Sequence, residues 1–261
     1  TLRMASEKGH LGLVKFLVKN SANIHAQKDE ALIMASKEGH LEVVKFLIEN
    51  GVDIHSQDDY SLIMASYNGH LEVVKFLIEN GADIHSQDDE ALIHASLNGH
   101  LEVVKFLIEN GLNNNYALIY ASRNGHLDVV KYLIERGVDM HTSIDQALRL
   151  SSENGHFEVV KYLIENGANI YICNNYSLKS ASENGHSEIV KLLIENGANI
   201  DNFGEALRVA SENGNLKIVK LLIKKNADLN LKNTDGQTPL HIACEKNYVN
   251  IVKLLIEKNA D

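Results

Sequence analysis

The side chains of this sequence that could carry out chemistry are its thirteen histidines and its many carboxylates. Such groups hold zinc or transfer protons where several of them converge on one point. The histidines, however, recur at fixed places of a repeated segment. Seven directly follow a glycine, four lie in the loop between segments, and two stand apart. In that order they are His10, His40, His70, His100, His126, His156 and His186; His25, His55, His85 and His141; and His94 and His241.

This spacing argues against a metal centre or an active site. Equivalent residues of neighbouring packed helices lie roughly 8–10 Å apart, whereas zinc needs nitrogen ligands about 2 Å from one ion. The sequence contains no GxSxG, HExxH or Walker-type motif. We therefore predict a protein that is not an enzyme, with no catalytic residue, no metal and no cofactor.

Composition excludes further classes. A net charge of −10 without a basic cluster disfavours nucleic acid as a partner. No apolar run approaches the roughly 20 residues of a membrane-spanning helix, so we expect no membrane partner. Cys173 and Cys244 are far apart and in no CxxC spacing, which indicates a reducing compartment. We expect a cytoplasmic monomer.

The dominant feature is an internal repeat. The segment GHLEVVKFLIENG occurs at 39–51, 69–81 and 99–111, and related copies follow at spacings of 30, 30, 30, 26, 30, 30, 29 and 33 residues. A near-fixed period of this length is typical of a solenoid. We predict one repeat domain over 1–261, with units at approximately 1–27 (partial), 28–57, 58–87, 88–113, 114–143, 144–173, 174–202, 203–232 and 233–261.

Each unit is predicted to contain two helices. In the unit 58–87, Asp59 is expected to cap a first helix that buries Leu62, Ala65 and Ser66 and stops near Gly69. A second helix is expected over 71–80, with an apolar stripe and with Gly81 in the left-handed conformation after its end. Asp29, Asp89, Asp145 and Asn175 are the equivalent caps.

The repeated segment resembles the ankyrin repeat family over essentially the whole chain. The last unit also carries that family's Thr238-Pro239-Leu240-His241-Ile242-Ala243 signature. The resemblance implies an all-α solenoid of about nine helix-turn-helix units that binds a protein partner. It also implies that each imidazole after a glycine bonds to the backbone of the neighbouring loop.

The other units depart from the family pattern because their hairpin fingers, the loops between units, are shortened. These short fingers, together with ASENGH and NGHLEVVK, resemble ankyrin repeat proteins of giant amoeba-infecting viruses of the mimivirus type. That resemblance implies a host protein as partner and the host cytoplasm as location.

Two columns of variable residues lie along the first helices, on the face that lines the concave groove in ankyrin proteins. We take these columns as the candidate partner-binding site, centred on Tyr67, Leu97 and Arg123, since Tyr and Arg dominate binding hot spots. The alternative is that the methionines pack against neighbouring first helices. One column is Met34, Met64, His94, Tyr120 and Leu150, continuing as Ser180, Val209 and Ile242; the other is Lys37, Tyr67, Leu97, Arg123 and Glu153.

The spacing of 26 residues is the largest irregularity of the repeat. Only four residues separate Gly111 from Tyr116, too few for a finger. The sequence therefore predicts a gap in the row of fingers. Either a partner loop enters this gap, or the gap is a tolerated deletion without a function.

Two other functions remain open. One is a substrate-recruiting adaptor of a ubiquitin ligase, acting through a segment outside this chain. The other is a substrate of an asparaginyl hydroxylase, with Asn230 as the best-matching finger residue.

Overall fold

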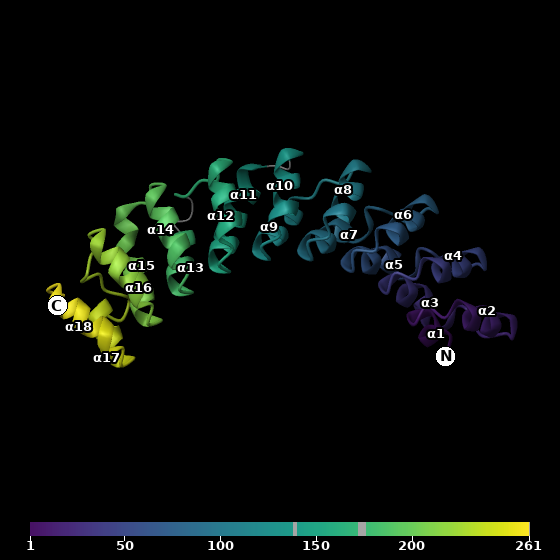
Figure 1. Cartoon of the computed structure of the whole chain (residues 1–261), viewed down its shortest axis with the longest axis horizontal. Helices are drawn as coiled ribbons and strands as arrows, with labels where there is room; N and C mark the ends of the chain where they lie inside the picture. Colours follow the sequence, from purple (N-terminus) through teal and green to yellow (C-terminus); the bar gives the residue numbers. More distant parts are fainter. Residues whose placement is uncertain (138–139, 172–175, 261) are drawn as a thin grey trace. The chain divides into compact units, whose positions relative to one another are not determined.

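The computed structural model describes residues 1–137, 140–171 and 176–260, and within them the chain forms only helices, turns and loops. Contacts divide it into two compact units, Thr1–Ala121 with Asp128–Val138, and Ser122–Leu127 with Asp139–Asp261. The predicted all-α class is thereby confirmed, and Figure 1 shows the helix pairs in chain order. No helix in the described residues is long and apolar enough to cross a membrane.

The first unit consists of successive helix pairs. The first helices pack on one another in order, α1 on α3, α3 on α5 and α5 on α7, and the second helices do the same. α9 begins in this unit and ends in the second. The bounds are α1 (Leu2–Glu7), α2 (Leu11–Lys19), α3 (Ala26–Lys37), α4 (Leu41–Glu49), α5 (Ser56–Tyr67), α6 (Leu71–Glu79), α7 (Ser86–Leu97), α8 (Leu101–Glu109), α9 (Asn115–Arg123) and α10 (Leu127–Glu135).

The second unit repeats the arrangement, with α11 packed on α13, α13 on α15 and α15 on α17. Its elements are α11 (Met140–Glu153), α12 (Phe157–Glu165), α13 (Tyr176–Glu183), α14 (Ser187–Glu195), a 3-10 turn η1 (Ile200–Asn202), α15 (Phe203–Glu212), α16 (Leu216–Lys224), α17 (Pro239–Glu245) and α18 (Val249–Glu257).

The second helix of each pair buries its predicted stripe. In α6, Val73, Val74 and Leu77 are buried, while Lys75 on the outer face pairs with Glu72 at 2.8 Å. Gly81 has the predicted positive φ of 101°. A unit cannot cover such a stripe alone, so the core is shared between neighbouring repeats.

The first helices start differently from the prediction. Asp29, Asp59 and Asp89 are not caps in extended conformation, because each has a φ between 56° and 66°. Each is the last of three consecutive left-handed residues, an arrangement that costs about 1–2 kcal/mol per residue. A bond of 3.0 Å between His55 Nδ1 and Asp59 Oδ1 holds this turn closed, and the other two turns have the same pair.

Helix starts elsewhere also differ. α11 begins at Met140, so His141 and Asp145, expected in a finger and at a cap, both lie inside a helix. Cys173 and the predicted cap Asn175 lie outside the described residues. Thr238 does cap α17 as its signature implied, because its hydroxyl accepts from the His241 backbone N–H.

Candidate functional site

A row of histidine bonds fixes the ends of the first helices. Each imidazole Nε2 lies 2.9–3.0 Å from the carbonyl oxygen at the end of the preceding first helix. Since a carbonyl only accepts, Nε2 carries the proton. This confirms, for five histidines, the backbone bond that the family resemblance implied. The pairs are His40 with Glu7, His70 with Lys37, His100 with Tyr67, His156 with Arg123 and His186 with Glu153.

The glycine before each histidine makes room for the ring of the next repeat. A Cβ on Gly69 would lie 2.5–2.8 Å from the His100 ring, closer than real contacts allow. Four of the carbonyl acceptors belong to the candidate residues Lys37, Tyr67, Arg123 and Glu153. The histidine row therefore fixes the backbone from which these side chains project.

None of the ten candidate side chains is fully buried. Tyr67 and Arg123 are exposed, and Met34, Lys37, Met64, His94, Leu97, Tyr120, Leu150 and Glu153 are half-buried. Further along, the expectation of an exposed column is wrong, because Ser180, Val209 and Ile242 are buried. Arg123, Leu150 and Glu153 belong to the second unit, whereas the other seven lie in the first.

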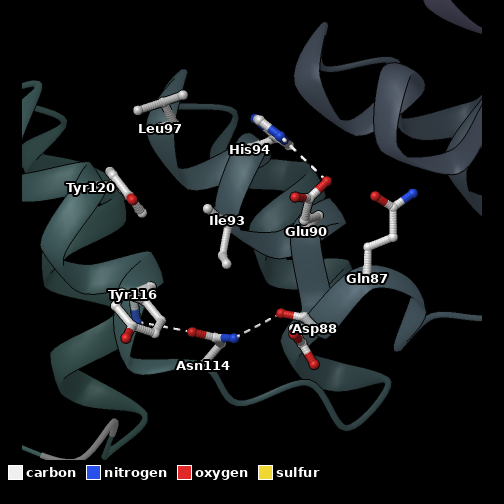
Figure 2. A pocket seen from close by; sticks show the side chains of 9 residues that line it. All are labelled: Gln87, Asp88, Glu90, Ile93, His94, Leu97, Asn114, Tyr116 and Tyr120. Atoms are coloured by element: carbon white, nitrogen blue, oxygen red, sulfur yellow. Dashed lines mark hydrogen bonds and ion pairs between the residues drawn. The ribbon is translucent and has the colours of Figure 1, made fainter. Parts of the chain in front are cut away.

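A cavity of about 550 Å³ lies between α7 and α9 in the first unit, and Figure 2 shows the side chains around it. Its size is within the range of ligand-binding pockets, about 300–1,000 Å³. It brings together three predicted residues, His94, Leu97 and Tyr120. The remaining lining residues, which sequence reasoning missed, are Gln87, Asp88, Glu90 and Ile93 on α7, Asn114 in the loop, and Tyr116 on α9.

The cavity lies at the junction that lacks a finger. Where a finger is present, Ser86 Oγ and Gln87 Nε2 both donate to the Asp58 carbonyl, at 2.6 and 3.2 Å. At the next junction only Asn114 makes the corresponding bond, with Nδ2 3.1 Å from the Asp88 carbonyl. The chain is four residues shorter there than at the preceding junction. The predicted gap in the finger row was the signal that located the cavity.

Asn114 also starts α9 without a left-handed turn. Its Oδ1 accepts from the Tyr116 backbone N–H at 2.9 Å, which satisfies one of the unpaired donors of the first helical turn. Tyr116 and Tyr120 then follow one helical turn apart, with ring centroids separated by 6.5 Å. On the other side of α7, the Tyr67 ring lies 5.5 Å from the His94 ring. Four aromatic rings therefore line or adjoin the opening.

The side chains around the cavity include acidic residues but no basic Lys or Arg. The acidic residues are Asp88 and Glu90. His94 Nε2 lies 3.9 Å from a Glu90 oxygen, at the limit of an ion pair, and the Glu90 side chain is 40% exposed. Among the described residues, no group of three or more His, Cys, Asp or Glu side chains is arranged to hold a metal ion. The arrangement is suited to binding an apolar or cationic group.

Comparison with known families agrees with this repeat structure. Residues 62–144, 143–204 and 178–261 match ankyrin repeats (3 copies), and residues 2–48 and 32–78 match ankyrin repeats (many copies). No curated protein matches the chain. The matched segments together run from residue 2 to residue 261, and the chain therefore belongs to the ankyrin repeat family.

Proposed function

We propose that this chain binds a partner protein through the first-helix face of its first unit, with the cavity between α7 and α9 as the centre of the site. Ankyrin repeats are in general protein–protein interaction modules. The observation that carries the proposal is the cavity itself, which opens at the one junction of the first unit that lacks a finger.

The cavity has the composition of a binding hot spot. Tyr116 and Tyr120 offer large, rigid rings with few rotatable bonds, and Ile93 and Leu97 add apolar surface from α7. α7 packs on α5, and His156 bonds the Arg123 carbonyl at the end of α9. A site that is already ordered loses little conformational entropy when a partner binds.

Restoring the finger provides the sharpest test. Residues 112–115 are replaced by the sequence ADIHSQDD of residues 82–89, which forms the finger of the preceding junction. The added serine and glutamine should reach the Asp88 carbonyl as Ser86 and Gln87 reach that of Asp58, and so fill the cavity. We expect a protein captured from a cell lysate by the wild type to be lost with this variant.

The controls separate loss of the site from loss of the fold. A Leu97→Ala/Tyr116→Ala variant should lose the same protein, while Glu183→Ala should retain it. Glu183 occupies the position equivalent to Leu97 in the unit 174–202 and is exposed there. Circular dichroism must show equal helicity for all four proteins. Retention of the same protein by the finger-restored variant would contradict the proposal.

The two other functions stay predictions. The adaptor function depends on sequence outside this chain. For the hydroxylase function, Asn230 is exposed in a turn, as a modifying enzyme requires, and intact mass of cell-derived protein would reveal one added oxygen. The viral resemblance and the cytoplasmic location are likewise untested expectations.

A further inference from the structure

One position of the first helix carries a cation in some repeats and isoleucine in others. In each repeat it lies two residues before a buried small residue, which is Ala5, Ala95 or Ala181 in three of the repeats. We call it the bridging position. Its occupants include Arg3, Arg149, Lys179 and Arg208, and also Ile33, Ile63, Ile93 and Ile119.

Three of the bridging cations, Arg3, Arg149 and Lys179, contact the first turn of the next repeat's first helix. Arg3 Nη1 lies 3.3 Å from Glu30 Oε1, and Lys179 Nζ lies 3.0 Å from Glu205 Oε1. The Arg149 guanidinium lies over the Tyr176 ring, 5.9 Å from its centroid. Glu30, Glu205 and Tyr176 occupy equivalent positions, so this place accepts a cation through either a carboxylate or an aromatic ring.

A bridging arginine also pairs within its own helix. Arg208 Nε and Nη2 lie 2.9 and 2.7 Å from the two carboxylate oxygens of Glu205, a bidentate pair. These bonds, followed by the one from Lys179, lower the pKa of Glu205 to about 2. Glu205 is therefore held as a carboxylate by two cations of the chain.

The cavity has the same surroundings with the cation missing. Glu90 is the equivalent of Glu205 in its own helix, Tyr116 is the equivalent of Tyr176 in the next repeat, and Ile93 stands at the bridging position between them. Figure 2 shows Ile93 between these two side chains at the edge of the open space. Tyr116 is 57% exposed and Glu90 is 40% exposed, so both can be reached from solvent.

We infer that the cavity binds an arginine side chain of a partner peptide, with its guanidinium on the Tyr116 ring and paired with the Glu90 carboxylate. This inference rests on the proposed function and specifies the chemistry of the partner. The incoming guanidinium takes the place that Arg149 and Arg208 fill from within the chain. The absence of Lys and Arg from the lining and the net charge of −10 both favour a cationic ligand.

Arginine fits these two groups better than lysine does. Its planar guanidinium stacks on an aromatic face and bonds both oxygens of one carboxylate at once, whereas an ammonium acts as a point charge. Its three methylenes can lie along Ile93 and Leu97. The cavity lies at the junction that lacks a finger, and Tyr116 and Glu90 are accessible to solvent there.

Titration of isotope-labelled protein with capped peptides, followed by amide chemical shifts, tests the inference. The probe is acetyl-Ala-Leu-Arg-Leu-Ala-amide, and its control replaces arginine by citrulline, which has the same shape without the charge. We expect the arginine peptide to shift the amides of residues 88–97 and 114–121 and to bind about tenfold more tightly than the citrulline peptide. Equal affinity for the two peptides overturns the inference.

Two substitutions locate the interaction. Glu90→Gln should weaken binding of the arginine peptide by about tenfold. Ile93→Arg should abolish it, because the new side chain fills the site from inside, as Arg208 does beside Glu205. Glu183→Arg is the control, because it adds the same side chain at an exposed first-helix position outside the cavity, and it should bind as the wild type does. Binding that survives in Ile93→Arg overturns the inference.

The peptide titration tests the inference about arginine, whereas the finger-restored variant tests the proposed function, so one can fail without the other. If the citrulline or an all-leucine peptide shifts the same amides as strongly as the arginine peptide, the cavity is a docking site but not one for arginine. If the arginine peptide shifts none of them at millimolar concentration, the inference is wrong. The proposed function is then still decided by the finger-restored variant and its lysate partner.

Discussion

The junctions α5–α7 and α7–α9 join first helices of nearly the same sequence, yet the first has a finger and the second lacks one. At the first junction, the finger is present, and Ser86 and Gln87 both donate to the Asp58 carbonyl. At the second, Asn114 alone bonds the Asp88 carbonyl, and a cavity of about 550 Å³ remains. In a solenoid, each repeat contacts only its neighbours, so the loss of four residues acts on the repeats next to it.

A second contrast lies between two carboxylates at the same helical position. Glu205 is paired with Arg208 and Lys179, while Glu90 has Ile93 in place of the arginine. The packing of the helices is thus the same in both repeats, whereas the carboxylate at this position is paired with cations of the chain in one repeat and lies at a solvent-accessible cavity in the other. Four predictions test this separation between framework and variable positions, from the largest expected effect to the smallest.

Gly69→Ala should cause the largest loss of stability, about 2–4 kcal/mol in the free energy of unfolding. Gly69 has a φ of 77°, and the added Cβ would also collide with the His100 ring. Gly81→Ala is the control, because Gly81 has positive φ but no atom within 4 Å of its Cβ position. It should lose only about 1–2 kcal/mol. Equal losses for the two variants in urea unfolding would mean that contact with the histidine ring contributes nothing to the cost of Gly69→Ala.

His100→Ala should lower the free energy of unfolding by about 1–2 kcal/mol, because the Tyr67 carbonyl loses its donor. His100→Asn should lose less. Asn215 already takes this place in a later repeat, where its Nδ2 donates to the Ser182 and Glu183 carbonyls at 2.9 and 3.1 Å. Urea midpoints of the two variants measure the difference. An asparagine variant as unstable as the alanine variant would refute the equivalence.

The double substitution Ser86→Ala/Gln87→Ala should lower the free energy of unfolding by about 1 kcal/mol, since it removes both bonds to the Asp58 carbonyl. Asn114→Ala removes the single corresponding bond at the junction without a finger and also the acceptor for the Tyr116 N–H. Thermal unfolding of both variants compares the two junctions directly. We expect similar losses of stability. Asn114 bonds the backbone of the preceding finger at the junction without a finger, as Ser86 and Gln87 do at the junction with one. No loss of stability from Asn114→Ala would contradict the expectation that its hydrogen bonds hold this junction together.

Glu205→Gln should have the smallest effect, about 0.5–1 kcal/mol at pH 7 once solvent screening of this partly exposed group is included. The pKa of Glu205 is lowered in the folded protein from its usual 4.5 to about 2. Its stabilising contribution is therefore complete above pH 4.5 and is lost as the pH falls toward 2. The difference in urea midpoint between wild type and variant should shrink over that range. Glu90→Gln is the matched control and should show a smaller difference at pH 7. A difference for Glu205→Gln that is constant with pH would contradict the pairing.

The sequence predicted most of the framework. Apolar spacing in the second helices places Val73, Val74 and Leu77 in the core, and the glycines at 51 and 81 take the positive φ expected after a helix. Asn226 and Asn259, which stand where other repeats have this glycine, also have positive φ. These features are local, or are repeated often enough that one period explains them all. The family resemblance supplied the histidine bonds.

Tertiary structure decided the features that depend on neighbouring repeats. Asp59 has an ordinary capping side chain, but bonds to His55 and to the Asp83 backbone N–H hold it in a left-handed turn. Val209 and Ile242 continue the column of His94 and Tyr120, yet packing in the second unit buries them. Periodicity alone predicts neither outcome, because the turn at Asp59 also depends on the Asp83 backbone about one repeat away, and the burial of Val209 and Ile242 depends on packing between helices.

The candidate site divides in the same way. The sequence determined the helix pairs, the gap in the finger row and the variable face on which His94, Leu97 and Tyr120 lie. Only the tertiary structure brought Glu90, Ile93 and Tyr116 to the rim of one cavity, since they come from two repeats and are joined by a loop whose path the sequence does not specify. Local propensity and periodicity describe each repeat alone, whereas a pocket between repeats exists only after both have packed.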